Sequence, residues 1–264
     1  MGLLNKSLLS GLLSLSRSSS YKQANKQEVK DQLLKEQILE CLVLNPSYGY
    51  RRVALALSLG KKRVRRVMRL FGIKPYKRKA RWRKRRDERR PEAIFTNLIK
   101  GRFPIVPNLI WVSDFTYLKY HDQYLYLATI MDLYTREIVG WYLSDRHTKD
   151  LTIEAFFDAF QNTGKLPQLV HSDQGSEYNC REYVQLMERL GVKVSMSKKS
   201  SPWENGYQES FFNNFKTELG LEFERFNTTG EFIEAIHQTI NYYNQYRIHT
   251  TLKMPPTKFR LLHS

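Results

Sequence analysis

The segment Leu109-Ile-Trp-Val-Ser-Asp-Phe-Thr-Tyr-Leu-Lys-Tyr120 decides the fold class of this 264-residue chain. Apolar and β-prone residues alternate with polar ones along it, which is typical of a strand. Two similar runs follow at residues 123–131 and 137–143, joined through a turn sequence at 132–136. The three runs therefore predict successive antiparallel strands.

Helical and extended patterns alternate beyond these strands. We expect helices at residues 151–161, 181–190 and about 202–219, with short strands at 169–171 and 192–195. This order predicts an α/β fold over residues 108–222, with a mixed five-stranded sheet flanked by helices. The sequence Thr228-x-x-Glu231 is a capping box, so residues 223–264 are predicted to form a C-terminal helical extension.

Basic residues are concentrated before the predicted sheet. The chain has a formal net charge of +17. Residues 51–90 hold 19 Lys and Arg against two acidic residues, whereas the rest of the chain has 24 basic and 24 acidic residues. A polyanion such as nucleic acid is the natural partner of this region. A solvated basic tail is the alternative interpretation.

Residues 26–73 predict a small all-α helix-turn-helix module. Helices are expected at 26–44, with Val29, Leu33 and Ile38 on one side, and at 51–57 and 61–71. Short helices, tight turns and a basic last helix favour DNA binding over a helical bundle with a basic surface. The side chains predicted to contact DNA here are Arg51, Arg52, Lys61, Lys62, Arg63, Arg65, Arg66 and Arg69.

The remaining segments carry simpler predictions. Residues 1–25 are interpreted as a leader with a short leucine-rich docking helix and a serine-rich break at 16–20. Residues 74–107 form a basic connector with too few apolar residues for a core, and we expect it to follow phosphates. No stretch approaches the length of a membrane span. Cys41 and Cys180 are too few for a disulfide framework, which fits a reducing cytoplasm.

Three acidic residues are the candidate catalytic groups. Asp114 lies in the first predicted strand, Asp173 follows the fourth, and Glu209 lies on the last helix of the core. Pairing of the first and fourth strands would bring both aspartates to one edge of the sheet, where ligands bind in open α/β folds. On the helix, Asn205 and Lys216 share the face of Glu209.

Carboxylates held close together repel one another unless a cation neutralises them. Two Mg²⁺ ions would do so, and would also activate a hydroxyl nucleophile and stabilise the leaving oxygen of a phosphodiester. We assign Asp114 as the bridging ligand, with Asp173 and Glu209 each binding one ion.

Four short motifs occur along the chain in a specific order. They are Trp111-x-x-Asp-Phe-Thr-Tyr, His171-Ser-Asp-Gln-Gly, Asn205-x-x-x-Glu-Ser-Phe and Tyr243-Asn-x-x-Arg-x-His-x-x-Leu. Together, over roughly residues 35–260, they resemble the second-reading-frame (OrfB-type) transposases of bacterial insertion sequences, DDE enzymes with a retroviral-integrase-like (rve) core. The resemblance implies a ribonuclease-H-like fold. It also identifies Asp114, Asp173 and Glu209 as the catalytic acids.

The resemblance further implies cofactors and partners. Two Mg²⁺ or Mn²⁺ ions would bind at the acids, and Lys216 would contact DNA near the cleaved bond. The expected nucleic-acid partner is double-stranded DNA, both the terminal inverted repeats of the element and the target. The expected protein partners are further copies of the chain, in a homo-oligomer on that DNA, and a first-frame protein. The expected location is the bacterial cytoplasm at the nucleoid, with no membrane partner.

For several other polar residues the sequence leaves two roles open or indicates a purely structural role. His171 either steadies the site or is a packed, hydrogen-bonded histidine. Arg247 and His249 either contact DNA or brace the catalytic helix, and Asn205 is expected to support the site. Asp132 is interpreted as a turn residue that accepts local hydrogen bonds.

The sequence predicts a transposase that nicks an element end and joins the freed 3′-hydroxyl to another phosphodiester. One alternative is a ribonuclease-H-like nuclease that cuts without joining. The other is a non-catalytic DNA-binding regulator, made as an orphan second-frame product. The basic N-terminal module and the closing motif favour transposition.

Overall fold

The computed structural model describes residues 17–77, 95–101, 104–197, 205–220 and 225–263. The chain divides into two compact units, Met1–Tyr76 and Lys77–Ser264. The docking helix predicted within residues 1–15 and most of the basic connector lie outside the described residues.

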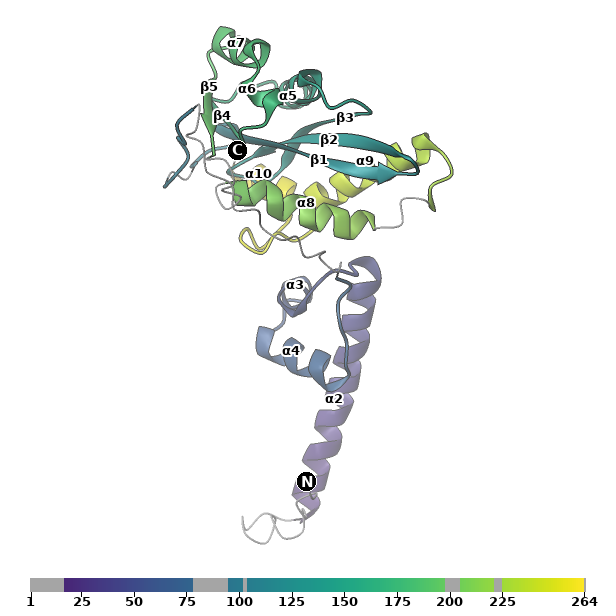
Figure 1. The fold of residues 1–264 in the computed structure, drawn as a ribbon. Coiled ribbons are helices and arrows are strands. Elements are labelled where there is room, and N and C mark those ends of the chain that lie inside the picture. The colour runs from purple at the N-terminus through teal and green to yellow at the C-terminus, as the bar shows by residue number, and fades with distance from the viewer. Residues whose placement is uncertain (1–16, 78–94, 102–103, 198–204, 221–224, 264) are drawn as a thin grey trace, which may run out of the picture. The chain divides into compact units, whose positions relative to one another are not determined.

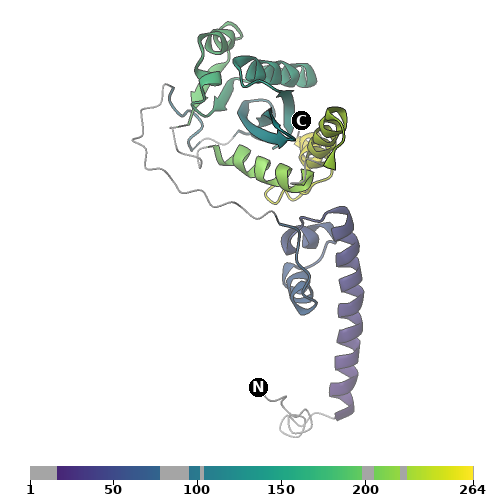
Figure 2. The ribbon, with the colours of Figure 1, turned by 45° about the vertical axis from the view of Figure 1, so that its right-hand side comes forward.

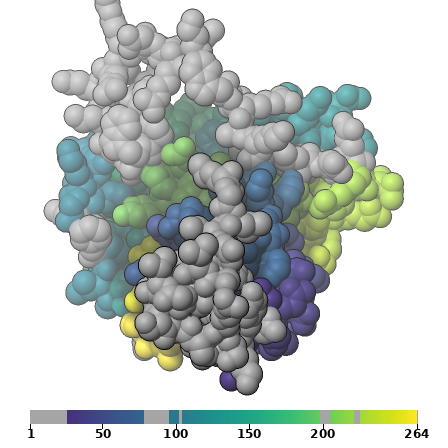
Figure 3. Space-filling view, turned by 90° about the horizontal axis from the view of Figure 1, so that it is seen from below, coloured from purple at the N-terminus to yellow at the C-terminus, as the bar shows by residue number. Residues whose placement is uncertain are grey.

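The described part of the N-terminal unit contains three helices, α2 (Arg17–Leu44), α3 (Tyr50–Ala56) and α4 (Lys61–Leu70). In the space-filling view the purple atoms of α2 lie against the blue atoms of the two shorter helices (Figure 3). The expected break at residues 16–20 is wrong, because α2 already begins at Arg17. Serine weakens a helix only slightly, so three serines do not end one.

The buried face of α2 also differs from the prediction. Leu34 and Ile38 are buried, whereas Val29 and Leu33 are exposed. Buried side chains of α3 and α4 complete this small core, and they are Val53, Ala54, Val64, Val67 and Met68. Val64, Val67 and Met68 therefore form the buried side of α4.

The second unit is built on a five-stranded mixed sheet in the order β3-β2-β1-β4-β5. β1 pairs antiparallel with β2 and β2 with β3, while β1 with β4 and β4 with β5 are parallel. The three predicted antiparallel strands and the pairing of the first with the fourth are confirmed. The strands are β1 (Ile110–Tyr120), β2 (Gln123–Asp132), β3 (Ile138–Ser144), β4 (Leu169–Ser172) and β5 (Lys193–Met196).

Helices cover both faces of the sheet, as Figures 1 and 2 show. On one face lie α5 (Lys149–Thr163), α6 (Ser176–Asn179) and α7 (Arg181–Arg189). On the other lie α8 (Gly206–Leu219) and α9 (Thr229–Gln245), followed by α10 (Pro256–His263). Thr228 caps α9 by accepting the backbone N–H of Glu231 at 3.1 Å, which confirms the predicted start of that helix.

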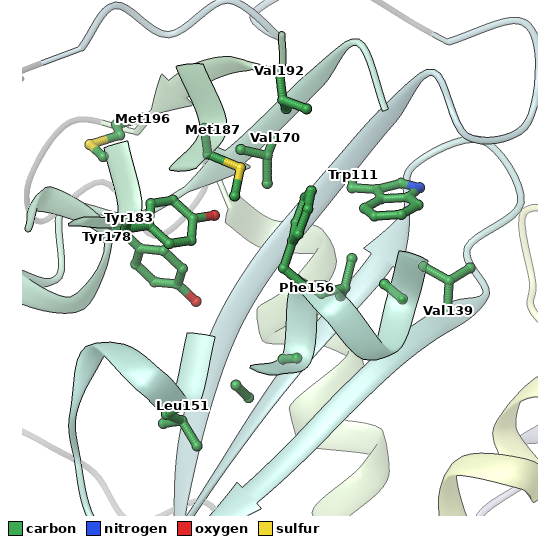
Figure 4. Close-up of a cluster of buried hydrophobic side chains, with 14 residues drawn as sticks. Trp111, Val139, Leu151, Phe156, Val170, Tyr178, Tyr183, Met187, Val192 and Met196 are labelled. Carbon is green, nitrogen blue, oxygen red and sulfur yellow. The ribbon is translucent and has the colours of Figure 1, made fainter. Parts of the chain in front are cut away.

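Each face of the sheet has its own apolar core. Between the sheet and α5 and α7, Trp111 meets Phe156 edge-on, with ring centroids 5.5 Å apart (Figure 4). Gly140 of β3 lets α5 approach closely, because a Cβ there would overlap the backbone of Ala159. The opposite core joins the sheet to α8 and α9 and includes Phe212, Phe215 and Leu219 of α8. Packing on both faces fixes the sheet edge at which the acidic residues lie.

Candidate active site

The two aspartates meet where β1 runs on beyond its short parallel partner β4. The pairing of β1 with β4 ends at Val112 opposite His171. Asp114 lies two residues beyond the first of these positions, and Asp173 lies two beyond the second. Both side chains are only partly buried. The parallel register therefore brings two carboxylates, far apart in the sequence, to one edge of the sheet.

The environment of Asp114 disfavours its charged form. Burial raises the pKa of this carboxyl group to about 8, and the neighbouring charges of Asp173 and Glu209 act in the same direction. The backbone N–H of Phe115, which donates to Asp114 at 2.8 Å, and the ammonium group of Lys216 oppose this rise in pKa. Asp114 is thus the carboxylate whose pKa is raised by the charges of both other acidic residues.

Asp173 lies in a tight loop between β4 and α6. Its Oδ1 accepts the backbone N–H of Gly175 at 3.0 Å. A Cβ at Gly175 would lie 2.8 Å from Oε2 of Glu177 and 3.1 Å from Oδ1 of Asp173, so only glycine leaves these carboxylates their positions. Burial raises the pKa of Asp173, and the charge of Glu177 raises it further.

Glu177 is a buried acidic residue that the sequence analysis did not single out. Its Oε1 lies 2.9 Å from Nε2 of His147 and accepts the hydroxyl of Ser176 at 2.9 Å. The ring of His147 contacts Phe115 at 4.6 Å and stacks on Tyr126 at 4.9 Å between centroids. This contact ties the Asp173 loop to β1 and β2. The available signal was its position four residues after Asp173, just beyond the His171-Ser-Asp-Gln-Gly motif.

Glu209 reaches the site from the first turn of α8. The preceding residue, Gln208, is fully buried, and its amide donates to the carbonyl of Val112 at 2.6 Å. The hydroxyl of Thr129 donates to the same Gln208 side chain at 3.1 Å. Asn205, at the start of the helix, is buried and lies 3.5 Å from the carbonyl oxygen of Ser113. Gln208, which the sequence analysis missed, therefore docks α8 onto the sheet while Glu209 stays exposed.

Lys216 lies two turns further along α8. Its Nζ donates to the carbonyl of Tyr117 at 3.1 Å and lies 5.2 Å from the centroid of that ring. Its charge lowers the pKa of Asp114. The helix thus presents an acidic and a basic side chain to the same strand.

The three acidic residues do not form a preformed chelating cluster. Among the described residues, no group of three or more His, Cys, Asp or Glu side chains is close enough together to hold a metal ion. Glu209 influences Asp114 through its charge, and Glu177, not Glu209, is the carboxylate that raises the pKa of Asp173. Oxygen donors suit Mg²⁺, and a cation would relieve the repulsion at Asp114. Asp114 and Asp173 therefore fit such an ion, with Glu209 at the rim.

Tyr178 is a further buried group next to the carboxylates. Its hydroxyl and that of Ser113 lie 2.8 Å apart. Burial raises its pKa well above the ordinary value, and the charges of Asp114 and Asp173 add to this. Tyr178 therefore stays protonated and joins α6 to β1 behind the acidic residues.

The structure favours the packing interpretation for His171 and the bracing interpretation for Arg247. His171 is fully buried, with Nδ1 2.9 Å from the hydroxyl of Ser195. Arg247 is also buried, and it donates to Glu218 at 3.0 Å and to Asn214 at 2.8 Å on α8. Its inclusion among the predicted DNA contacts is therefore not supported, because the guanidinium is used inside the protein. His249 pairs with Met254 in an isolated bridge.

Most basic side chains predicted to contact DNA in the N-terminal unit are at its surface. Arg66 differs from the others because its guanidinium forms an ion pair within the protein. It donates to both carboxylate oxygens of buried Asp31, with one hydrogen bond of 2.6 Å. That pair holds α4 to α2. Exposed or partly exposed positions are found for Arg51, Arg52, Lys61, Lys62, Arg63, Arg65 and Arg69. No helix among the described residues is long and apolar enough to cross a membrane.

Comparison with known proteins identifies the family. Integrase core domain models match residues 106–202 and 190–256. The chain is 35% identical over 223 residues to an uncharacterized 31 kDa protein of insertion element IS600 from Shigella sonnei, covering 81% of each. It is 32% identical over 242 residues to the transposase of IS904 from Lactococcus lactis, covering 88% of this chain and 94% of the relative. The chain belongs to the insertion-sequence transposases with an integrase core domain.

Solved structures confirm the ribonuclease-H-like fold. The HTLV-2 integrase catalytic core in complex with magnesium aligns with a TM-score of 0.50 and 20% identity, over 59% of this chain and 98% of the other. A simian T-cell lymphotropic virus intasome aligns with a TM-score of 0.55 and 17% identity, over 82% and 71%. By its family the protein is a polynucleotidyl transferase that acts in DNA integration and recombination.

Proposed function

We propose that this transposase cleaves a DNA strand and transfers the freed 3′-hydroxyl by using Asp114, Asp173 and Glu209. The observation that carries the proposal is the position of Asp114 and Asp173 just beyond the parallel pairing of β1 with β4, where the charges of Asp173 and Glu209 raise the pKa of Asp114. A structural carboxylate is normally paired with donors or cations, whereas this one faces further anions. Such an arrangement is typical of a site that takes up a cation.

The ligands proposed for divalent ions are the carboxylate oxygens of these three residues. Two Mg²⁺ or Mn²⁺ ions, when bound, would activate the attacking hydroxyl and stabilise the leaving oxygen of an in-line phosphoryl transfer. Asp114 is the residue suited to serve both ions, since it is flanked by the other two. Glu209 is exposed and can change rotamer without disturbing the buried Gln208 that anchors its helix.

The remaining residues hold the substrate and the scaffold. Lys216 is placed to bind a phosphate beside Asp114, in exchange for its bond to the carbonyl of Tyr117. Arg247 and its partner Glu218 keep α8 in register while DNA binds. His147 and Glu177 keep the Asp173 loop against the sheet.

The proposed DNA partners are the terminal inverted repeats of the element and a target duplex. The exposed basic side chains of α4 support DNA binding by the N-terminal unit, because neutralised phosphates give affinity without sequence specificity. We also propose a homo-oligomer on DNA, in keeping with the trimeric form of the HTLV-2 core and the intasome among the structural relatives. A first-frame protein and a location at the bacterial nucleoid in the cytoplasm complete the proposal.

A strand-transfer assay tests this function. The full chain is incubated with Mg²⁺ or Mn²⁺ and a labelled oligonucleotide that carries the end of the element, and the products are separated by length. Glu209→Gln removes a proposed ligand at an exposed position. Glu188→Gln, an equally exposed change on α7, is the matched control.

The products separate the three candidate functions. Joined products that require Glu209 but not Glu188 support the transposase. Shortened strands without joining support a nuclease. Binding without any chemistry would refute the catalytic proposal and leave a DNA-binding regulator.

A further inference from the structure

An exposed row of tyrosines lies on the sheet face that α5 covers further along. Tyr117, Tyr124 and Tyr142 are 44%, 49% and 40% exposed. They alternate with buried residues that point to α8 and α9, so all three lie on the same face. Together with Tyr126 and Lys119, these side chains are called the aromatic strip. In Figure 1 the far ends of β1 and β2 extend past α5, with α9 on their other face.

Two basic side chains, Lys119 and Lys216, adjoin the aromatic strip, and the exposed Asp122 lies in the turn that joins β1 to β2. Lys119 is exposed on the same face and lies opposite Tyr124 in the register of the two strands. The ammonium group of Lys216 lies 5.2 Å from the ring centroid of Tyr117. No acidic residue occurs on this face among residues 113–120, 123–128 and 140–144 of the strands. The surface is therefore complementary to an anionic and aromatic ligand.

The aromatic strip and Asp114 lie on opposite faces of β1, because successive side chains of a strand alternate. Two contacts join the strip to the acidic residues. Tyr126 stacks on His147, which pairs with Glu177 beside Asp173, and Lys216, on the same helix as Glu209, lies over the ring of Tyr117. Tyr117 and Tyr124 then meet edge-on with centroids 5.8 Å apart. A strand bound between the Asp173 loop and Lys216 would thus have its neighbouring nucleotides next to these rings.

We propose that the aromatic strip is a stacking platform for unpaired bases of the DNA strand that is bound at the carboxylates. Tyrosine rings on a sheet surface can stack only on base faces that no duplex neighbour covers, and lysines beside them bind the phosphates. A second protein copy fits less well, because interface cores are depleted of lysine. The proposal rests on the proposed function in taking DNA as the ligand and in placing that DNA at the carboxylates.

Binding without metal ions tests the aromatic strip separately from the chemistry. The full chain is titrated into a fluorescein-labelled thymidine oligonucleotide of about 15 nucleotides, long enough for one binding surface of this type. The comparison probe is a blunt duplex of the same length, and the readout is anisotropy. Tyr124→Ala should weaken single-strand binding about 10-fold and duplex binding much less. Tyr124→Phe should retain affinity, and Tyr246→Ala, at a position 64% exposed on the C-cap of α9, is the control.

The salt dependence of binding distinguishes stacking from charge. Tyr124→Ala should leave the log–log salt slope on single strands unchanged. Lys119→Ala should reduce its magnitude by about 0.7, as expected for one phosphate contact. Thermal unfolding of each variant verifies that it is folded.

Three results would overturn the stacking platform. The first is an equal loss of affinity of Tyr124→Ala for the single strand and the duplex, and the second is no loss of affinity for either. The third is a shift of Tyr124→Ala from dimer to monomer with DNA binding unchanged, which would assign the surface to a second copy. Strand cleavage, lost or kept in Asp114→Asn, tests the proposed function separately. An inactive wild-type chain that still needs Tyr124 for single-strand binding would refute the chemistry and leave the aromatic strip in place.

Discussion

Asp114 and Asp132 lie on neighbouring strands of one sheet, and burial raises the pKa of both carboxyl groups. Asp132, at the end of β2, accepts three backbone N–H groups at 2.6–3.1 Å and the hydroxyl of Thr135 at 2.8 Å. At Asp114 the structure shows a backbone N–H from Phe115 and two neighbouring carboxylates. One carboxylate is satisfied by donors, whereas the other faces anions.

This difference separates a structural acid from a candidate catalytic one. Burial alone is the same signal at both positions, so it does not distinguish them. The distinction lies in what surrounds the oxygens: donors that fix a turn, or like charges that only a cation can neutralise. The interpretation of Asp132 as a turn residue is confirmed by its hydrogen bonds.

The largest expected effect is on catalysis. Asp114→Asn should reduce strand transfer by about 10³-fold or more, because a metal ligand contributes several kcal/mol to the transition state. Asp132→Asn, measured on its soluble, folded fraction, should retain most of the activity. Rates of joined-product formation check both variants, and equal losses in the two would contradict the distinction drawn between them.

The next largest effect is on the free energy of unfolding, and here the substitution at Asp132 should have the larger effect than the one at Asp114. Asp132→Ala should lower the free energy of unfolding by about 3 kcal/mol, since it leaves buried N–H groups without an acceptor. Urea unfolding without metal ions measures this. Asp114→Ala is the comparison and should cost much less. A larger loss at Asp114 than at Asp132 would show that Asp114 is a structural acid.

The pH dependence of stability gives a smaller effect. Asp114 has an ordinary pKa of 3.8 and a folded-state pKa of about 8, so between these values the folded chain binds a proton that the unfolded chain has released. The metal-free protein should therefore become less stable as pH rises from about 4 to about 8. Asp114→Asn should reduce this slope, since the raised pKa values of Asp132 and Asp173 still contribute to it, and should be more stable than wild type at pH 8 by about 2 kcal/mol, partial exposure having reduced the effect.

Unfolding of both proteins across this pH range, with and without Mg²⁺, checks that prediction. Mg²⁺ should raise the Tm of the wild type and leave that of Asp114→Asn nearly unchanged, because binding to the native state stabilises it. A wild-type Tm that rises from pH 4 to pH 8 in the absence of metal ions would contradict this prediction.

The smallest effect concerns the support of Asp173. His147→Leu should lower the free energy of unfolding by about 1 kcal/mol, since buried Glu177 loses its partner. Strand transfer should also fall, as the Asp173 loop is less firmly held. Lys149→Leu breaks an ion pair with Glu182 in which both side chains are well exposed, and should change neither quantity measurably. Similar behaviour of the two variants would remove His147 from the site.

Periodicity in the sequence was sufficient to predict the sheet. The apolar and β-prone residues of 109–120 indicate a strand, and the helical patterns indicate which segments cover the sheet. The sequence was a weaker guide for α2, where Leu34 rather than Leu33 is buried. Several faces of that helix carry apolar residues, so only packing against α3 and α4 selects one.

The sequence by itself determined the identity and order of the acidic residues and the elements that carry them, because residue type and periodicity are local properties. The parallel pairing of β1 with β4, which brings Asp114 and Asp173 together, is a tertiary contact. Tertiary structure alone decided which polar groups face them. Gln208 anchors α8, Glu177 and His147 hold the Asp173 loop, and Arg247 turns inward to Glu218. These partners come from segments far apart in the chain, and the free energy of burying a charge depends on where the fold brings its partner.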